Sequence, residues 1–388
     1  MRELEFLEDE DEISQDIFDM VLRGPYSEPL CPRLLKLSWI ADPIFGGDFT
    51  SFLSPQLQHI RLESRPGTVF PFSHAISILP ASSLKSLRLC ILGDEPVREA
   101  ITSMFKACGE SLTTLTVSRM DQLQDGSWCR IMLYPRLRTL ETDQFPPTPP
   151  NLPMVFPSLR RIVLRGPAAP EWIRFLAASS VQKIPSDTGS KPRQVAPFLV
   201  RLCCDYDTLG PQFASHIRVF RNLYTLILRN GCPRQCTFNL TDDDVSQLAM
   251  ELPGLRELSL GTPCYRSTCW TTVNSLLTLS THCKGLRGLS IHFNTLNIAQ
   301  DMRASLQNPL RRNSYPPSRC PLPVLDVGRT PLPALGGDVF PILAGLVDIF
   351  PELTGIRFYH STPGWSQLVE QIPRFQEMRK SLPAVFTQ

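Results

Sequence analysis

Two pairs of cysteines offer the clearest metal-binding chemistry in this sequence. Cys232 and Cys236 are separated by three residues, and Cys264 and Cys269 are separated by four. Four thiolates brought together would form the tetrahedral ligand set that Zn²⁺ prefers. Structural zinc sites more often use cysteines two residues apart, and a buried cysteine also serves as a small apolar side chain. We therefore expect ordinary thiols here, with zinc as the alternative, and we predict no cofactor.

The common catalytic motifs are absent from the chain. It contains no P-loop, no G-x-G-x-x-G, no G-x-S-x-G and no H-E-x-x-H. Its six histidines show no ligand-like spacing. The sequence therefore predicts a protein that is not an enzyme, and a zinc hydrolase built on the four cysteines is the least favoured hypothesis.

Length and composition favour a folded protein with several domains or with repeats. The chain has 388 residues, 42% apolar residues and 37 prolines, which fits many short elements separated by turns. No apolar run approaches the roughly 18–20 residues of a membrane span, and no secretory signal is visible. The 12 scattered cysteines indicate reduced thiols. We expect an intracellular protein, cytoplasmic and/or nuclear, without a membrane partner.

The charge distribution is uneven but mild. Residues 1–20 hold nine acids and one Arg, so the formal net charge of +2 leaves +10 on the remaining residues. This bias is too weak to indicate nucleic-acid binding.

A repeated hexad, Leu-x-x-Leu-x-Leu with apolar substitutes, supplies the elements that would position any functional residue. Its first leucines run from Leu34 to Leu353, 319 residues over eleven intervals, or 29 per interval. The twelve hexads begin at Leu34, Leu57, Leu84, Leu112, Leu137, Leu159, Leu199, Leu223, Leu255, Leu286, Leu322 and Leu353. The hexad at Leu137 has Thr142 as an imperfect third position.

Residues 240–264 show what surrounds a hexad. Thr241 and three aspartates can cap a helix start, apolar residues then recur at helical spacing, and Pro253 ends the helix before the strand-like hexad. Such helix–turn–strand units bury a core only by stacking. Because packed helices need more room than paired strands, the stack must curve with its strands inside. The sequence thus predicts an α/β repeat fold, a curved solenoid (horseshoe) with a parallel concave sheet and convex helices.

These hexads resemble leucine-rich repeats. The segment "LTDDDVSQLAMELPGLRELSLGTPC", followed by "VNSLLTLSTHCKGLRGLSI", is similar to the cysteine-containing type of F-box/leucine-rich-repeat proteins. Cys31, Cys108 and Cys283 fall at or near that type's pre-strand cysteine, and Cys232 and Cys264 fall at its post-strand position. The irregular, Pro-rich units resemble divergent fungal F-box-like proteins. An F-box of roughly fifty residues would precede the repeats, but no room for one is visible ahead of them in this chain.

The predicted organisation has three parts. Residues 1–30 would hold a partial repeat and an acidic segment with an amphipathic helix, 31–360 the solenoid of about twelve units, and 361–388 a capping segment broken near Pro373. Loop insertions are expected near 143–153, 181–195 and 307–323, because Pro, Ser and Gly are concentrated there.

Residues between the leucines should face outward on the concave surface. They form either an ordinary solvated sheet face or an Arg-containing docking surface for an acidic or phosphorylated protein segment. The candidate contacts are His59, Arg61, Arg88, Arg161, Arg165, Arg201, Asp205, Arg229, Glu257, His292, Arg357 and Tyr359.

The predicted function is recognition of a protein partner on this concave face. The resemblance implies a substrate-recruiting, F-box-like adaptor of a cullin-type ubiquitin ligase, which would contact the ligase core only through an F-box. The alternative is a leucine-rich-repeat scaffold or regulator unrelated to a ligase.

Overall fold

The computed structural model describes most of the chain. The described residues are 3–6, 29–41, 49–64, 76–79, 81–90, 95–118, 125–143, 156–165, 169–181, 199–206, 208–209, 216–230, 237–238, 240–261, 271–295, 297–307, 320–328, 330–332, 339–359 and 363–381. The chain divides into two compact units, Met1–Phe198 and Leu199–Gln388, a division that the sequence did not predict.

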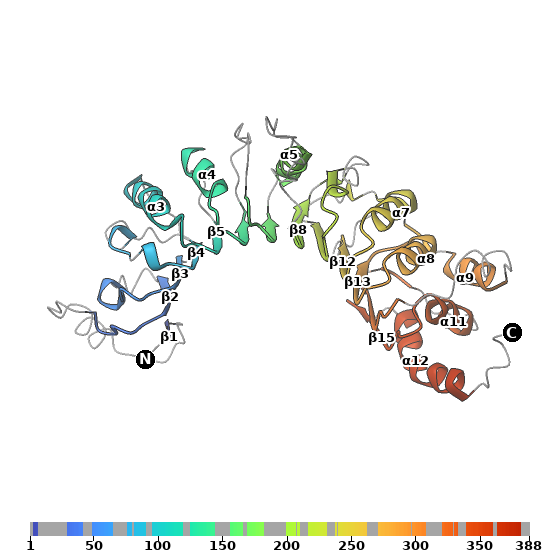
Figure 1. Ribbon diagram of the computed structural model, residues 1–388. Coiled ribbons are helices and arrows are strands. Elements are labelled where there is room, and N and C mark those ends of the chain that lie inside the picture. The colour runs from blue at the N-terminus through green and yellow to red at the C-terminus, as the bar shows by residue number, and fades with distance from the viewer. Residues whose placement is uncertain are drawn as a thin grey trace. The chain divides into compact units, whose positions relative to one another are not determined.

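Unit 1 is a stack of parallel strands with helices on one face (Figure 1). Its strands pair in chain order: β1 (Glu3–Phe6), β2 (Lys36–Ala41), β3 (His59–Ser64), β4 (Ser86–Cys90), β5 (Thr114–Ser118), β6 (Thr139–Thr142) and β7 (Arg161–Leu164). Its helices are the short 3-10 turns η1 (Phe49–Phe52) and η2 (Ala81–Ser83) and the α-helices α3 (Glu95–Cys108), α4 (Asp125–Met132) and α5 (Ala169–Val181).

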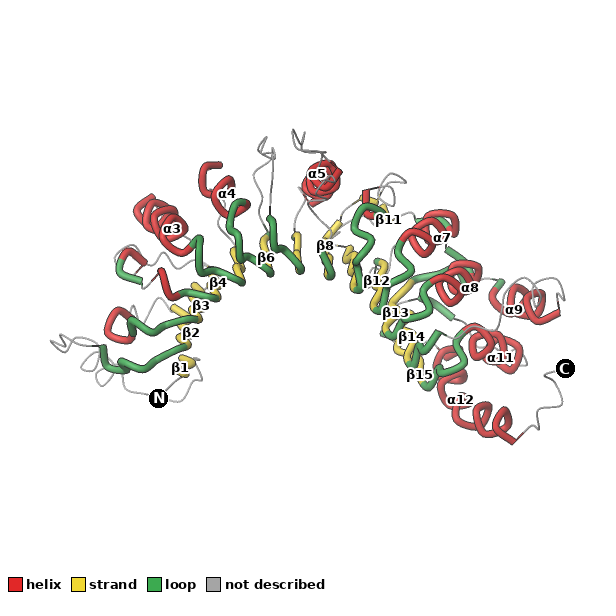
Figure 2. The backbone as a smooth tube through the Cα atoms, in the orientation of Figure 1, coloured by secondary structure: helices red, strands yellow, loops and turns green. Residues whose placement is uncertain are grey.

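Unit 2 repeats this arrangement with a helix after most strands, as the alternation of strand, loop and helix in Figure 2 shows. The main strands are β8 (Arg201–Tyr206), β10 (Thr225–Asn230), β12 (Glu257–Leu260), β13 (Gly288–Ile291), β14 (Val324–Gly328) and β15 (Gly355–Phe358). The helices are α7 (Asp242–Glu251), α8 (Val273–His282), α9 (Ile298–Gln307), α11 (Val339–Ile349) and α12 (Pro363–Ser381). Two short strands, β9 (Thr208–Leu209) and β11 (Thr237–Phe238), form a separate parallel pair.

Every predicted hexad contributes one of these strands, and the middle leucines lie in register. In unit 1, Leu37 pairs with Ile60 and Ile60 pairs with Leu87. In unit 2, Leu226 pairs with Leu258 in the same way. All five side chains are at most 2% exposed. The hexads therefore stack into an apolar ladder beneath the helices, which confirms the curved leucine-rich-repeat fold within each unit.

The imperfect hexad position also belongs to this core. Thr142 is fully buried and pairs with Val117 on one side and Leu164 on the other. Its threonine side chain takes the place of the third apolar residue, so a polar side chain is accommodated without loss of register.

Helix α7 forms where its capping residues predict. Thr241 and Asp244 make a reciprocal capping box, in which the Asp244 N–H donates to Thr241 Oγ1 (3.2 Å) and the Thr241 N–H donates to Asp244 Oδ2 (2.9 Å). Val245 and Leu248 then face the core. This is the helix start that the sequence 241–244 indicated.

Buried thiols link successive repeats of unit 2 at the pre-strand position. Cys283 Sγ lies 3.7 Å from the carbonyl oxygen of Leu252, at the end of α7, and Cys320 Sγ lies 3.5 Å from that of Leu286. Burial raises the pKa of Cys283 to about 12 and that of Cys320 to about 11. Cys320 was not among the pre-strand cysteines that the sequence comparison singled out.

One expected helix break is wrong. Helix α12 runs through Pro373 without interruption. Proline removes a single backbone N–H, and the turns on either side still form their own hydrogen bonds. At its start the helix is fixed by the buried Trp365, whose Nε1–H donates to the Thr330 carbonyl oxygen (2.8 Å).

Candidate functional site

The candidate contacts are assigned to the sheet face opposite the helices. Because side chains alternate along a strand, residues between the buried leucines point to this face. The pattern is clear in β12, where Glu257 and Ser259 are half-buried while Leu258 and Leu260 are buried. The same alternation holds in β3 and β5.

A three-residue charge cluster lies on this face of unit 1. Arg61 binds Glu63 through two hydrogen bonds, Nε to Oε1 (2.9 Å) and Nη2 to Oε2 (3.0 Å). Arg88, from the next strand, also reaches Glu63 (Nε to Oε1, 2.8 Å). Arg61 and Arg88 are register neighbours, so Glu63 offsets a like-charge contact between them. The hydrogen bond from Arg61, assisted by the charges of both arginines, lowers the pKa of Glu63.

His59 lies beside this cluster at the start of β3. Partial burial lowers its pKa below 6.5, and the positive charges of Lys36 and Lys85 lower it further. The neutral imidazole is therefore favoured at neutral pH. This residue adds a hydrogen-bonding group rather than a charge to the face.

The far end of unit 1 repeats the pairing of arginine with acid. Arg165 Nη2 lies 2.6 Å from Glu141 Oε1. Arg161 is exposed and makes no ion pair within the described residues. Val163, the residue opposite Glu141 in β7, is only 7% exposed although it occupies an outward position.

Unit 2 has a looser ion pair and a small apolar strip. Arg201 and Glu257 flank Thr225 in register, and Arg201 Nη2 is 4.0 Å from Glu257 Oε2. Cys203 and Ile227 occupy the next outward positions and are each 8% exposed. This part of the face combines a charged border with an apolar centre.

The last strands of unit 2 present polar and aromatic groups. Ser259 pairs in register with Ser290, and Asp326 pairs with Arg357. Arg357 is exposed, and Tyr359, just after β15, is 53% exposed. A partner could therefore reach hydroxyl, carboxylate, guanidinium and phenol groups along these strands.

His292 is a correction to the expected surface. It is only 9% exposed, and its carbonyl oxygen accepts a hydrogen bond from Thr271 Oγ1 (2.5 Å), just before α8. An outward position in the alternation was therefore not sufficient for exposure.

Several predicted features lie outside the described residues. They are the side chains of Asp205 and Arg229, the four cysteines Cys232, Cys236, Cys264 and Cys269, the amphipathic helix of the N-terminal segment, and most of the insertions 143–153, 181–195 and 307–323. Among the described residues, no group of three or more His, Cys, Asp or Glu side chains could hold a metal ion.

The sequence analysis missed the role of the acids that pair with the arginines. Glu63 and Glu141 are not among the candidate contacts named from the sequence, yet each one binds a neighbouring arginine. The useful signal was available: Arg61 and Glu63 lie two residues apart in one strand, and therefore on one face.

In the described part of the chain, no helix is long and apolar enough to cross a membrane.

Comparisons with known proteins give no family match and two distant structural likenesses. No protein-family model matches the sequence, and no curated protein matches it at a significant level. A chain from the yeast Rad7–Elc1 complex is similar over 76% of this chain and 70% of its own length, with 16% identity and a TM-score of 0.43. The leucine-rich repeat-containing protein LegL7 from Legionella pneumophila is similar over 83% of this chain and 98% of its own, with 12% identity and a TM-score of 0.38. At these values we base no functional conclusion on either likeness.

Proposed function

We propose that this chain recognises a protein partner on the helix-free faces of its parallel sheets. The observation that carries the proposal is the ordered set of outward side chains on β3, β4 and β12–β15. Parallel strands hold these side chains in register, and ion pairs such as Arg61–Glu63 fix some of them before any partner arrives. A surface ordered in advance loses less side-chain entropy on binding.

We further propose that the recognised protein is a substrate delivered to a cullin-type ubiquitin ligase. Support for this step comes from the resemblance of residues 240–291 to the cysteine-containing F-box/leucine-rich-repeat type. Two residues typical of that type have a structural role in this chain. Thr241 caps α7, and the buried Cys283 contacts the end of the same helix.

The test uses a bulky side chain to block the face. Ser290, in the middle of β13, is replaced by Trp, and the matched control is Asn274→Trp on the exposed surface of α8. Partners of the native chain are identified by chemical crosslinking and mass spectrometry in cell extract. We expect Ser290→Trp to lose the crosslinked partner and Asn274→Trp to keep it. Equal capture by both variants would contradict recognition through this face.

The ligase role has a separate readout. The same purifications are probed for a cullin and for ubiquitin transfer to the captured partner. Capture of the partner together with a cullin supports the adaptor. Capture of the partner without any ligase subunit would instead favour a scaffold or regulator.

A further inference from the structure

A second surface lies at the edge where the strands begin. The residue after the first leucine of each hexad leaves the core there, just before its strand. Of these twelve positions, five are Lys or Arg and none is Asp or Glu, whereas the whole chain has 39 Lys and Arg among 388 residues. The five are Lys85, Arg138, Arg160, Arg256 and Arg287, and all are exposed.

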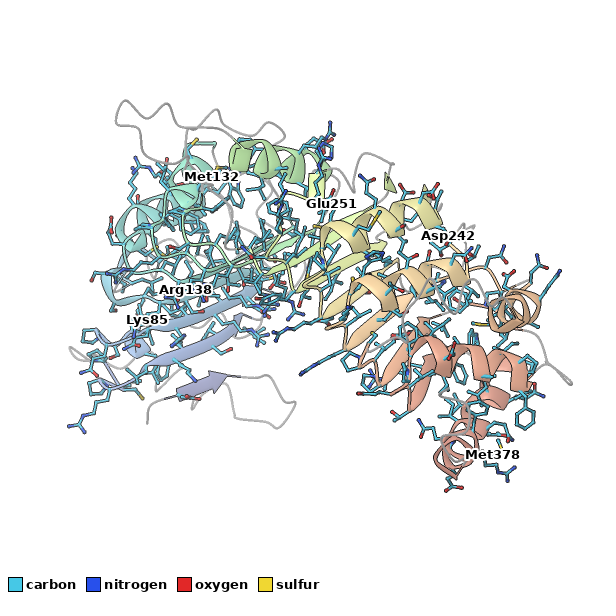
Figure 3. All side chains as sticks on the ribbon, turned by 45° about the vertical axis from the view of Figure 1, so that its right-hand side comes forward. Lys85, Met132, Arg138, Asp242, Glu251 and Met378 are labelled. Carbon is cyan, nitrogen blue, oxygen red and sulfur yellow. The ribbon has the colours of Figure 1, made fainter. Side chains whose placement is uncertain are left out.

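In unit 1 these positions follow one another along a backbone ladder. The Thr113 N–H donates to the Lys85 carbonyl oxygen, the Arg138 N–H to that of Thr113, and the Arg160 N–H to that of Arg138, each at 2.8 Å. Lys85 and Arg138 lie near each other on this unit (Figure 3). Adjacent strands are about 4.8 Å apart, so the backbones of Lys85, Arg138 and Arg160 lie within about 15 Å of one another.

Two more arginines widen this group. Arg136 precedes the first leucine of its hexad, and Arg161 follows Arg160 at the start of β7; both are exposed. We call Lys85, Arg136, Arg138, Arg160 and Arg161 the basic edge of unit 1. Within the described residues, none of the five makes an ion pair, in contrast to Arg61, Arg88 and Arg165 on the sheet face.

The partial negative charges at the ends of nearby helices neutralise only part of the positive charge of the basic edge. Helices α3 and α4 end near this edge, and each helix C-terminus carries about half a negative charge. Together they offset about one of the five positive charges. Glu110, in the turn before β5, adds one acid. The basic edge therefore keeps a clear positive excess.

Unit 2 has a smaller edge of the same kind, with an aromatic residue. Arg256 lies over the ring of Tyr224, 4.8 Å from its centroid. The Arg287 N–H donates to the Arg256 carbonyl oxygen (2.7 Å). Gly254 lies beside the ring, where an added Cβ would be in ordinary van der Waals contact with it, 3.6 Å from Tyr224 Cε1. The side chains of Tyr224 and Arg256 thus form a flat, cationic surface.

We propose that the basic edge of unit 1 binds an acidic, Asp- or Glu-rich segment of another polypeptide chain. Unpaired guanidinium groups bind carboxylates with charge-assisted, bidentate hydrogen bonds. Nucleic acid is disfavoured because the whole chain has a net charge of only +2 and an isoelectric point near 8.0, whereas nucleic-acid-binding domains are commonly above about 9. The inference does not depend on the proposed recognition by the sheet face.

The test measures binding of defined probes to the full chain by fluorescence anisotropy. The probes are a labelled peptide that alternates Glu with Ser, the same peptide with Gln in place of Glu, and single-stranded and duplex DNA of similar length. The edge variant is Arg138→Glu with Arg160→Glu. The control variant is Arg174→Glu with Arg374→Glu, which makes the same change in net charge at exposed positions on α5 and α12.

We expect the Glu peptide to bind the native chain and the Gln peptide not to bind. The edge variant should bind the Glu peptide at least about tenfold more weakly, and the control variant should change affinity less than about threefold. Affinity should fall as NaCl rises to about 0.15 M, because the contacts are exposed charges.

Three results would overturn the proposal: no binding of the Glu peptide to the native chain, equal weakening in both variants, or tighter binding of DNA than of the peptide. If the edge variant loses its native circular dichroism spectrum, Arg138→Gln with Arg160→Gln replaces it, with Arg174→Gln and Arg374→Gln as its control. Ser290→Trp, which blocks the sheet face in unit 2, should leave binding of the peptide to the basic edge of unit 1 unchanged.

Discussion

Asp242 should contribute more to the stability of unit 2 than a surface helix-start acid usually does. Its carboxylate accepts hydrogen bonds from the Thr272 N–H (2.7 Å) and from Thr272 Oγ1 (2.6 Å), and it also accepts from the buried Ser275 hydroxyl. These bonds join the first turn of α7 to the first turn of α8. Replacing Asp242 with Ala removes all three contacts at once.

The expected cost follows from these contacts. A hydrogen bond to a charged group contributes roughly 1.5–3 kcal/mol, and a buried hydroxyl left without its acceptor costs about 1–3 kcal/mol. Water can replace part of this around Thr272, which is half-buried. We therefore expect Asp242→Ala to lower the free energy of unfolding by about 2–4 kcal/mol, with Asp242→Asn in between because one acceptor oxygen remains.

The neighbouring acid provides the control. Asp243 is exposed in the same first turn and shares the favourable interaction with the helix dipole, worth about 0.3–1 kcal/mol. Urea unfolding followed by circular dichroism measures both variants, and equal denaturant slopes would show that the comparison is sound. If Asp242→Ala costs no more than Asp243→Ala, the idea that this carboxylate joins the two repeats is refuted.

Two further outcomes test the core of unit 2. Gly345→Ala should destabilise the chain by about 1–3 kcal/mol in thermal unfolding, despite the better helix propensity of alanine. The reason is steric, because the new Cβ would lie 3.0 Å from Met302 Cγ and closer still to its Sδ. Gly345→Ala combined with Met302→Ala should cost less than the sum of the two single variants. Cys283 should resist alkylation in the native chain at pH 8 and react after unfolding, as peptide mass spectrometry can show. Burial raises the pKa of the Cys283 thiol from 9.0 to about 12, so between these pH values the folded state keeps the thiol proton while the unfolded state loses it. This contribution to stability is complete below pH 9. It is lost as the pH rises from 9 towards 12, by about 1.4 kcal/mol per pH unit. A Cys283→Ala variant that keeps the same alkaline loss of stability would contradict this assignment.

Most of the fold could be predicted because its causes are local in sequence. Each hexad determines where its own strand lies. Because side chains alternate along a strand and one face of the strand is packed against the core, the position of the leucines also determines which side chains are buried. Even the imperfect hexad at Thr142 formed its strand in register with its neighbours. The same locality explains why the capping residues Thr241 and Asp244 placed the start of α7 correctly.

The charge pattern of the candidate surface was less predictable. Arg88 and Glu63 are far apart in sequence, and only the register of β3 against β4 brings them to 2.8 Å. The contacts of Asp242 with Thr272 and Ser275 have the same origin, since they join two successive repeats. Sequence reasoning identified the outward arginines but did not establish which of them were already paired.

The sequence by itself therefore determined the repeat, the strands, the buried leucines and the side of each strand that faces outward, because a hydrophobic period acts over a few residues. Only the tertiary structure decided which of the described charges are paired with one another and which are not. Ion pairs form between strands that are neighbours in space, so Arg61 and Arg88 are bound by an acid while Arg138 and Arg160 make no ion pair within the described residues. His292 shows the same limit: its place in the alternation predicts exposure, but in the tertiary structure it is buried.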